Sequence, residues 1–353
     1  MDKKDYPFKF GLGAGNKIIA ALVLLLIGLI LPIFVRSPYY LTLVITAGVG
    51  AILAMTFILQ LKTGLVSMGI AVFWGIGAYT STILMVNFHL SFWWCLPITT
   101  LFTALVSLLL GFVLIRNPGF SFVIMTMIIA MVFVVAVGST EYLGGYVGIH
   151  SIPTVTTIDV AFFPTIEFSS KVSLYYLLLF LFFLIVTILA AFYSSSIGRA
   201  WTVIGLNGKL AESLGINTYR YRLIAFVLAC SIDGLIGSYY AHFLGSVSPE
   251  SFDLFKTIYV HVYAMLGGIQ FPFLGPIVGS FLMVFFPEYM RITKEFEVII
   301  TGCLLVVLVI FLPTGILSIR GLKTLAREPV PTVLKIGGLF RRHGSGQIGK
   351  RET

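Results

Sequence analysis

Few polar side chains lie deep inside the apolar stretches of this chain, and the most unusual is Asp233, in ACSIDGLIGSYY. Ionisable residues inside membrane-spanning segments are rare and often functional, so Asp233 could contact the ammonium group of a small substrate. A structural role, as a neutral or hydrogen-bonded side chain, is an equal alternative. Tyr259 and His261 stand in another apolar stretch and could also contact a substrate.

Enzymatic chemistry has no support in the residue spacing. The acidic residues at 159, 167, 288 and 295 fall in loops or turns, without a nucleophile and a base at usable spacing. The histidines at 89, 150, 242, 261 and 343 form no metal-ligand pair at helical spacing. We therefore expect a protein that is not an enzyme and needs no metal or cofactor.

The segment 64–79 is rich in small residues and allows two interpretations. Small side chains let helices pack closely, which we favour, or they leave a smooth surface along which a substrate could pass. Its GIG triplet lacks the strand and helix of a dinucleotide site. Candidate path residues are Ser67, Gly69, Gly75, Gly77, Tyr79, Asp233, Tyr259, His261, Gly267 and Gly268.

One long polar loop, 194–221, interrupts the apolar stretches. Within it, NGKLAESLGIN predicts a helix of two turns, with Asn207 or Gly208 as N-cap and a left-handed glycine at the C-terminal end. We expect Leu210, Leu214 and Ala211 on one side. Such a short helix is unstable alone and needs a surface to dock against. Its candidate docking residues are Asn207, Lys209, Leu210, Ala211, Glu212, Leu214 and Gly215.

Composition indicates which solvent surrounds these elements. Of the 353 residues, 58% are hydrophobic and 10% charged, with a mean hydropathy of +1.03. Soluble domains are about 25% charged, so the chain is a polytopic membrane protein. Its excess of basic residues then reports topology and not a nucleic-acid partner. Cys95, Cys230 and Cys303 lie far apart and are interpreted as packing residues.

The apolar periods predict an all-α membrane fold with about ten spans, some of them short or broken. A bilayer core needs about 20 apolar residues per helix. Gly267, Gly268 and Pro272 predict a break or tight turn at membrane depth. The expected spans are 18–35, 39–61, 65–86, 92–115, 121–140, 173–193, 222–243, 257–270, 273–290 and 298–318.

Basic residues predict the orientation. All Lys and Arg fall on one face except Arg36, Lys171, Lys256, Arg291 and Lys294. The positive-inside rule makes that face cytoplasmic, with both termini on it. We expect a cytoplasmic segment 1–17, a transmembrane domain 18–320 with an outer loop 141–172, and a basic cytoplasmic tail 321–353. The first apolar run is interpreted as a retained helix and not a signal peptide.

Several blocks in the chain resemble the permease family of branched-chain amino acid ABC transporters, from about residue 40 to 320. The polar loop matches the family's cytoplasmic loop through Gly198, Arg199, Ala200, Ala211, Glu212, Leu214, Gly215, Ile216 and Asn217. The segments TGLVSMGIAVFWGIGAYTSTIL, LGGYVGIHSIP, YYAHFLGSVSPESF, LGGIQFPFLGPIVGSFLMVFFPE and IFLPTGIL match further blocks in order. The segment VIGLNGK departs from the family because it lacks most of the charge usual there.

The resemblance implies a prokaryotic cytoplasmic-membrane import permease. Its implied partners are two ATP-binding subunits, a second permease subunit and an extracytoplasmic substrate-binding protein, with the polar loop as the ATPase-coupling helix. GLNGKL is not a phosphate-binding loop, because Val203 and Leu210 replace its first glycine and its hydroxyl residue. ATP hydrolysis would therefore belong to another subunit.

The expected function is import of branched-chain amino acids. Urea, short amides and nucleosides remain alternative substrates within the family. In a different class, an ion-coupled secondary transporter would need an internal repeat and carboxylates at broken helices, whereas Asp233 is alone and no repeat is evident.

Overall fold

The computed structural model describes residues 25–26, 28–32, 37–155, 170–290 and 315–316. The predicted segment 1–17 and the basic tail lie outside these residues, as do most of the first and tenth spans and residues 156–169 of the predicted outer loop. Two short strands and the connecting segments apart, the described chain is helical. Its elements are α2 Pro38–Leu61, α3 Ile70–Val86, α4 Phe92–Leu114, α5 Phe120–Gly138, η1 Glu141–Leu143, β1 Ile149–His150, α6 Lys171–Ser194, α7 Ser196–Leu206, α8 Gly208–Ser213, α9 Thr218–Leu244, β2 Ser246–Val247, η2 Pro249–Phe252, α10 Leu254–Gly267 and α11 Leu274–Met290.

The prediction of a polytopic helical fold is confirmed. Helices α2, α4, α5, α6 and α9 are each long and apolar enough to cross a membrane, and every span predicted between residues 39 and 290 contains a helix. Local signals set several helix starts: the side chains of Ser170, Asn217 and Asp253 accept hydrogen bonds from first-turn amides of α6, α9 and α10.

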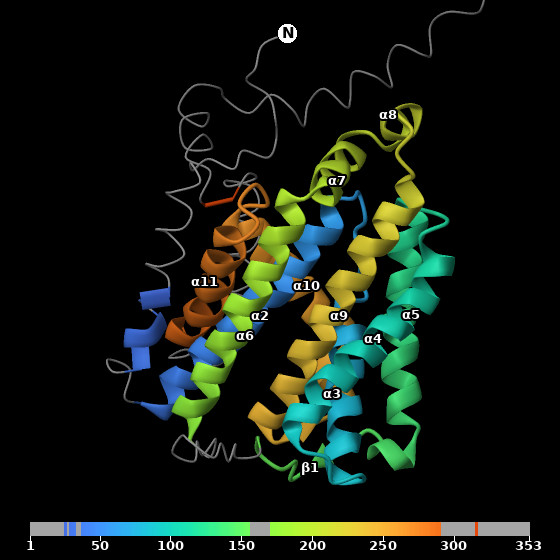
Figure 1. Cartoon of the computed structure of the whole chain (residues 1–353). Coiled ribbons are helices and arrows are strands. Elements are labelled where there is room, and N and C mark those ends of the chain that lie inside the picture. The colour runs from blue at the N-terminus through green and yellow to red at the C-terminus, as the bar shows by residue number, and fades with distance from the viewer. Residues whose placement is uncertain (1–24, 27, 33–36, 156–169, 291–314, 317–353) are drawn as a thin grey trace, which may run out of the picture.

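Two ends of the bundle can be told apart in Figure 1. The end that carries α7 and α8 is called the loop end, and the end that carries β1 and β2 is called the strand end. The strands pair antiparallel, with Ile149 opposite Val247 and His150 opposite Ser246. This pairing attaches the predicted outer loop to the end of α9, where Gly245 closes the helix in a left-handed conformation.

Helix α9 occupies the middle of the bundle and packs most closely on α3 and α4 (Figure 1). A Cβ atom on Gly77 would lie 2.0 Å from the Gly234 carbonyl oxygen, and one on Gly237 would lie 2.0 Å from the Trp74 carbonyl oxygen. Glycine at these positions therefore allows α3 and α9 to meet at backbone distance.

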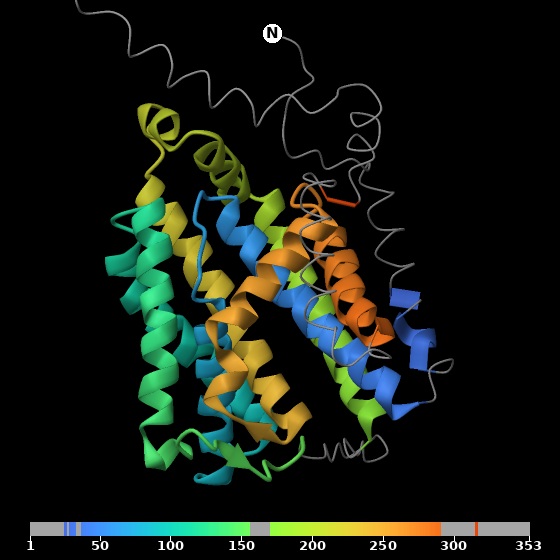
Figure 2. The same ribbon diagram turned by 180° about the vertical axis from the view of Figure 1, so that it is seen from behind.

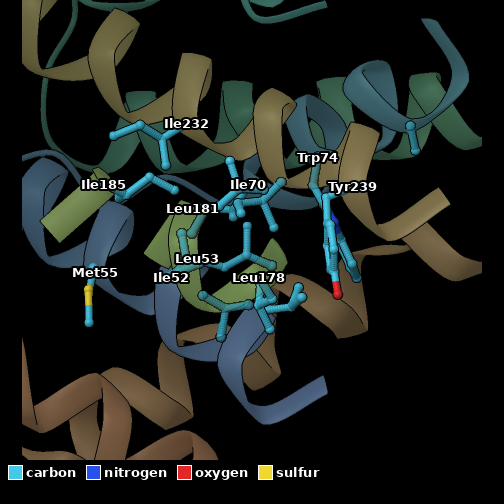
Figure 3. Packing of buried hydrophobic residues seen from close by; sticks show 14 of the residues in the cluster. Ile52, Leu53, Met55, Ile70, Trp74, Leu178, Leu181, Ile185, Ile232 and Tyr239 are labelled. Carbon is cyan, nitrogen blue, oxygen red and sulfur yellow. The ribbon is translucent and has the colours of Figure 1, made fainter. Parts of the chain in front are cut away.

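An apolar core fills the space between α2, α3, α6 and α9. Figure 3 shows side chains from these helices meeting in one region: Ile52, Leu53, Ile70, Trp74, Leu178, Leu181, Ile185, Ile232 and Tyr239; Met55 belongs to the same core but points away from them. Most of these side chains are less than 6% exposed. This core keeps α9 in register with its neighbours.

The predicted span 65–86 is wrong at its start, because α3 begins only at Ile70. Residues 62–69 form a turn and an irregular segment that enters the bundle beside α5 and α10 (Figure 2). The amide of Met68 donates to Thr126 Oγ1 at 3.0 Å, and the amide of Ala71 donates to Thr257 Oγ1 at 3.1 Å. Side chains therefore replace the helical hydrogen bonds, which makes irregular backbone tolerable inside the bundle.

The predicted break after Gly267 exists. Helix α10 ends at Gly267 and α11 begins at Leu274. The Phe273 ring lies 5.8 Å from the ring of Tyr193, which is near the loop-end terminus of α6. The turn thus lies toward the loop end of the bundle (Figure 1). The glycines allow tight contact there, since a Cβ on Gly267 would lie 1.7 Å from the Gly275 carbonyl oxygen.

Candidate functional site

The predicted short helix in the polar loop is confirmed as α8. The Asn207 side chain accepts a hydrogen bond from the Leu210 amide at 3.2 Å, which makes it the N-cap. Gly215 adopts a positive φ of 80° just after the helix, as a left-handed C-terminal glycine should. The helix α7 precedes α8, and together they project from the loop end (Figure 1).

Apolar side chains point outward from α7 and α8. Leu206, Leu210 and Leu214, spaced four residues apart, are 53%, 55% and 66% exposed. We call these three residues the leucine stripe. Ala211 is fully buried, so it faces the bundle and does not share a side with the leucines as expected. Lys209 and Glu212 are exposed beside the stripe.

Hydrogen bonds hold the loop to the bundle. Thr218 Oγ1 donates to Glu212 Oε1 at 2.7 Å, which joins α8 to the first turn of α9. The indole of Trp201, fully buried, donates to the Tyr221 carbonyl at 2.9 Å. Arg222 Nε donates to the Thr63 carbonyl at 3.1 Å. Sequence reasoning missed these anchors, although a tryptophan inside a polar loop was a usable signal.

Lys62 follows α2 directly and lies at the base of the loop. Its Nζ is 3.8 Å from the centre of the Tyr193 ring, a cation–π contact. Burial lowers the pKa of the Lys62 ammonium to about 8 because desolvation disfavours the charged form. A Cβ on Gly205 would lie 2.3 Å from the Lys62 carbonyl oxygen, so α7 rests directly on this turn.

The candidate path residues fall into three places. In the first, Ser67 and Gly69 belong to the irregular segment, and His261 lies opposite on α10. The His261 ring contacts the Thr257 carbonyl through Nδ1 at 2.6 Å and packs at a tilt of 49° against Phe57, with ring centres 4.0 Å apart. Its Nε2 has no hydrogen bond among the described residues.

The second place is the interface of α3 and α9 with its neighbours. Gly77 contacts Gly234 there, and a Cβ on Gly75 would lie 2.7 Å from the Phe133 ring. Tyr79 is 3% exposed and packs edge-on to Phe133. Close packing accounts for these small residues; a further role along a path stays a prediction. Asp233, fully buried, lies on the α2 side of α9, where it contacts Thr56.

The third place is α10 and its turn. Tyr259 is 43% exposed on α10, and Gly267 and Gly268 form the turn to α11 described above. The candidate path residues are therefore spread along the bundle. Within the described ranges, no group of three His, Cys, Asp or Glu side chains is arranged to hold a metal ion.

A buried polar chain at the strand end was also missed by sequence reasoning. Ser238 Oγ donates to Ser81 Oγ at 2.7 Å, and Ser81 Oγ lies 2.8 Å from His242 Nε2. His242 Nδ1 lies 2.9 Å from the Pro153 carbonyl oxygen. This chain ties α3, α9 and the loop after β1 together, and its residues carry no spacing signal because they come from three segments.

Comparisons with known proteins agree with this architecture. The chain is 32% identical over 273 residues to the high-affinity branched-chain amino acid transport system permease protein LivM of Escherichia coli (strain K12). It is 31% identical over 273 residues to LivM of Salmonella typhimurium. Each match covers 72% of this chain and 64% of the relative. The chain thus spans slightly less than two thirds of the length of these curated relatives.

A second, more distant relative is the permease protein LivH of the same transport system in Escherichia coli (strain K12). It is 27% identical over 127 residues, which are 35% of this chain and 40% of LivH. No solved structure matches the chain. A family model described as "Branched-chain amino acid transport system / permease component" matches residues 39–312, and the chain therefore belongs to this permease family.

Proposed function

We propose that this chain is a permease subunit of an ATP-binding-cassette importer that moves branched-chain amino acids across the cytoplasmic membrane of a prokaryote. Membership of the permease family and the names of LivM and LivH support this function. Two separate ATP-binding subunits would supply the energy. A second permease subunit and an extracytoplasmic substrate-binding protein would complete the transporter.

The leucine stripe is the observation that carries the coupling part of the proposal. Three exposed leucines on a projecting loop are unfavourable in water, whereas burial of each contributes about 1.5–3 kcal/mol. The stripe lies among polar residues, including Asn207, Lys209 and Glu212, so lipid does not suit it. A cleft on an ATP-binding subunit would bury the leucines and leave the polar rim in water.

The distribution of charge supports a cytoplasmic loop end. Lys62, Arg199, Lys209 and Arg220 lie in or next to the projecting loop. Lys171 begins α6 at the opposite end. Under the positive-inside rule, the loop end faces the cytoplasm and the strand end faces outward. Both chain termini would then also be cytoplasmic.

For the substrate path, we favour the region of the irregular segment. Ser67 and Gly69 belong to irregular backbone inside the bundle, and His261 Nε2 on α10 is without a hydrogen bond among the described residues. Discontinuous helices can offer backbone dipoles to the carboxylate and ammonium of an amino acid. The surrounding apolar residues suit an aliphatic side chain.

The test is ATP-driven uptake of labelled leucine into proteoliposomes that contain this chain, its partner permease, the ATP-binding subunits and the binding protein. The double variant Leu210→Asp with Leu214→Asp removes the apolar part of the stripe. We expect at least about a tenfold loss of uptake and of ATPase co-purification, since one buried leucine already contributes more than 1.4 kcal/mol. Val147→Asp, at a 74% exposed site near β1, is the control for co-purification.

The outcomes separate the parts of the proposal. Uptake that is independent of the stripe would contradict the coupling role. ATP turnover that depends on the stripe, with movement of urea, an amide or a nucleoside in place of leucine, would correct the substrate. Uptake by this chain alone, driven by an ion gradient, would overturn the assignment in favour of a secondary transporter.

A further inference from the structure

Asp233 makes one short contact in the interior of the bundle. It is fully buried on α9, and its Oδ1 lies 2.6 Å from Thr56 Oγ1 on α2. The same Thr56 oxygen lies 2.7 Å from the carbonyl oxygen of Leu53, one turn earlier on α2. Both separations are typical of complete O–H···O hydrogen bonds.

Counting hydrogens bears on the protonation of Asp233. A threonine hydroxyl carries one hydrogen, and a peptide carbonyl can only accept, so the one Thr56 hydrogen faces two short contacts. A threonine within a helix commonly directs this hydrogen to a carbonyl of the preceding turn, here that of Leu53. The contact with Asp233 then needs a second hydrogen, which a protonated carboxyl supplies.

The surroundings of the second carboxyl oxygen agree with this count. Asp233 Oδ2 has no hydrogen-bond partner among the described residues. An ionised carboxylate would leave a charged oxygen without a donor inside the membrane, which is costly. The titratable neighbour coupled to Asp233 is the Cys230 thiol on α9, which supplies no positive charge.

The contact between Asp233 and Thr56 lies where α9 packs against several helices at once. The next residue, Gly234, touches α3 at Gly77, and a Cβ on Gly234 would lie 2.3 Å from Thr103 Oγ1 on α4. At this level α9 thus meets α2, α3 and α4 together. Helix α9 also begins directly at the α8 loop, through the bond between Thr218 and Glu212. Any movement of the loop therefore reaches this level along one continuous helix.

We propose that Asp233 is carried as a neutral carboxylic acid that donates a hydrogen bond to Thr56, and that it acts as a positioning residue that holds α9 against α2 during transport. This role differs from a contact with the substrate ammonium group, which would require a carboxylate that reaches the transport path.

Infrared spectroscopy of the intact complex in membranes tests the protonation. The wild-type minus Asp233→Asn difference spectrum should contain the C=O stretching band of a protonated carboxylic acid near neutral pH, with a shift in heavy water. Thr56→Val, which keeps the side-chain shape, should move this band without abolishing it. A difference spectrum that contains carboxylate bands in its place would overturn the proposal, whatever the transported substrate is.

Transport kinetics test the positioning role, and this arm rests on the proposed function. The amide of Asp233→Asn can still donate to Thr56, so uptake should stay within about twofold of wild type, whereas Asp233→Leu and Thr56→Val should lose about tenfold in maximal rate, as expected for one buried hydrogen bond. The KM for the substrate should not change in any of the three.

The two arms can fail separately. A rise in KM for Asp233→Asn, at unchanged maximal rate, would identify a substrate contact and contradict the positioning role. If Asp233→Leu does not assemble, Thr56→Val and Asp233→Asn still decide the question. If wild type moves no leucine, the proposed function fails, while the infrared result continues to decide the state of Asp233.

Discussion

In the middle of α9, Gly234 and Gly237 lie against backbone atoms of α3, whereas at its loop end the same helix continues into a projecting loop with three exposed leucines. The middle is held by close contact that leaves no room for a side chain. The loop is held by separate hydrogen bonds from Trp201 and Thr218, and beneath it Arg222 joins α9 to the turn after α2. The difference predicts a rigid centre and a projecting loop that can be altered without unfolding the bundle.

The largest effect is expected where the centre is tightest. Gly77→Ala would place a methyl group 2.0 Å from the Gly234 carbonyl oxygen, and backbone on both helices cannot yield as a flexible side chain would. Overpacking of this kind costs about 1–3 kcal/mol or more. We expect a lower melting temperature and loss of monodisperse protein in size-exclusion chromatography.

Gly69→Ala is the matched control for that variant. The nearest atoms to its added methyl group, on Thr126, lie at 3.6 Å, an ordinary contact distance. It should melt close to wild type. If Gly77→Ala also melts like wild type, the contact between α3 and α9 is not as rigid as described.

A second pair of variants compares an exposed leucine on a membrane-spanning helix with an exposed leucine on the projecting loop. Leu105 on α4 is 53% exposed and Leu214 after α8 is 66% exposed. An aspartate at a helix centre in the membrane costs about 2.5–3.5 kcal/mol, so Leu105→Asp should lower the melting temperature. Leu214→Asp should keep it and weaken ATPase binding. Equal falls in melting temperature for the two variants would mean that exposure alone, and not position, determines the effect.

A smaller effect is expected from loosening the loop. Thr218→Val removes the hydroxyl that donates to Glu212, which contributes about 0.5–1.5 kcal/mol. Hydrogen exchange of residues 207–217 should speed up and ATPase affinity should fall a few-fold, while the melting temperature of the bundle is unchanged. Glu212→Gln keeps an acceptor oxygen and should behave like wild type. Equal exchange rates in Thr218→Val and wild type would exclude this bond as an anchor.

A pH-dependent effect concerns Lys62, at the junction of the two regions. Burial lowers its pKa from 10.5 to about 8, so between these values the folded chain has released a proton that the unfolded chain keeps. The stability contributed by this residue therefore rises with pH over that window and is lost as pH falls through the lower value. Lys62→Met should melt above wild type at about pH 7, with a gap that closes at alkaline pH.

Much of the fold could be predicted from local signals. The lengths of the apolar segments predicted the long helices. Asn207 and Gly215 predicted the ends of α8, because capping depends on residues that are adjacent in the sequence. The irregular segment 62–69 could not be predicted, because its residues are as apolar as a helix and its partners, Thr126 and Thr257, are distant in sequence.

The candidate site was predictable to the same extent. The loop, with Leu210 and Leu214, followed from the pattern, whereas the exposed Leu206 did not. Ala211 faces the bundle because α8 rests on its neighbours, which no periodicity within the loop reveals. The pairing of Asp233 with Thr56 spans 177 positions and depends on how α2 and α9 pack. Contacts of this kind are set by tertiary structure.

The irregular segment also has a consequence for biosynthesis. The amide of Met68 in this segment is satisfied by a hydroxyl group on α5, and the amide of Ala71, in the first turn of α3, by one on α10, which is synthesised more than a hundred residues later. Until then these backbone groups need water or the translocation machinery as partners, because lipid supplies none. We therefore expect α3 to reach its final depth late, after the ribosome has released α10 into the membrane.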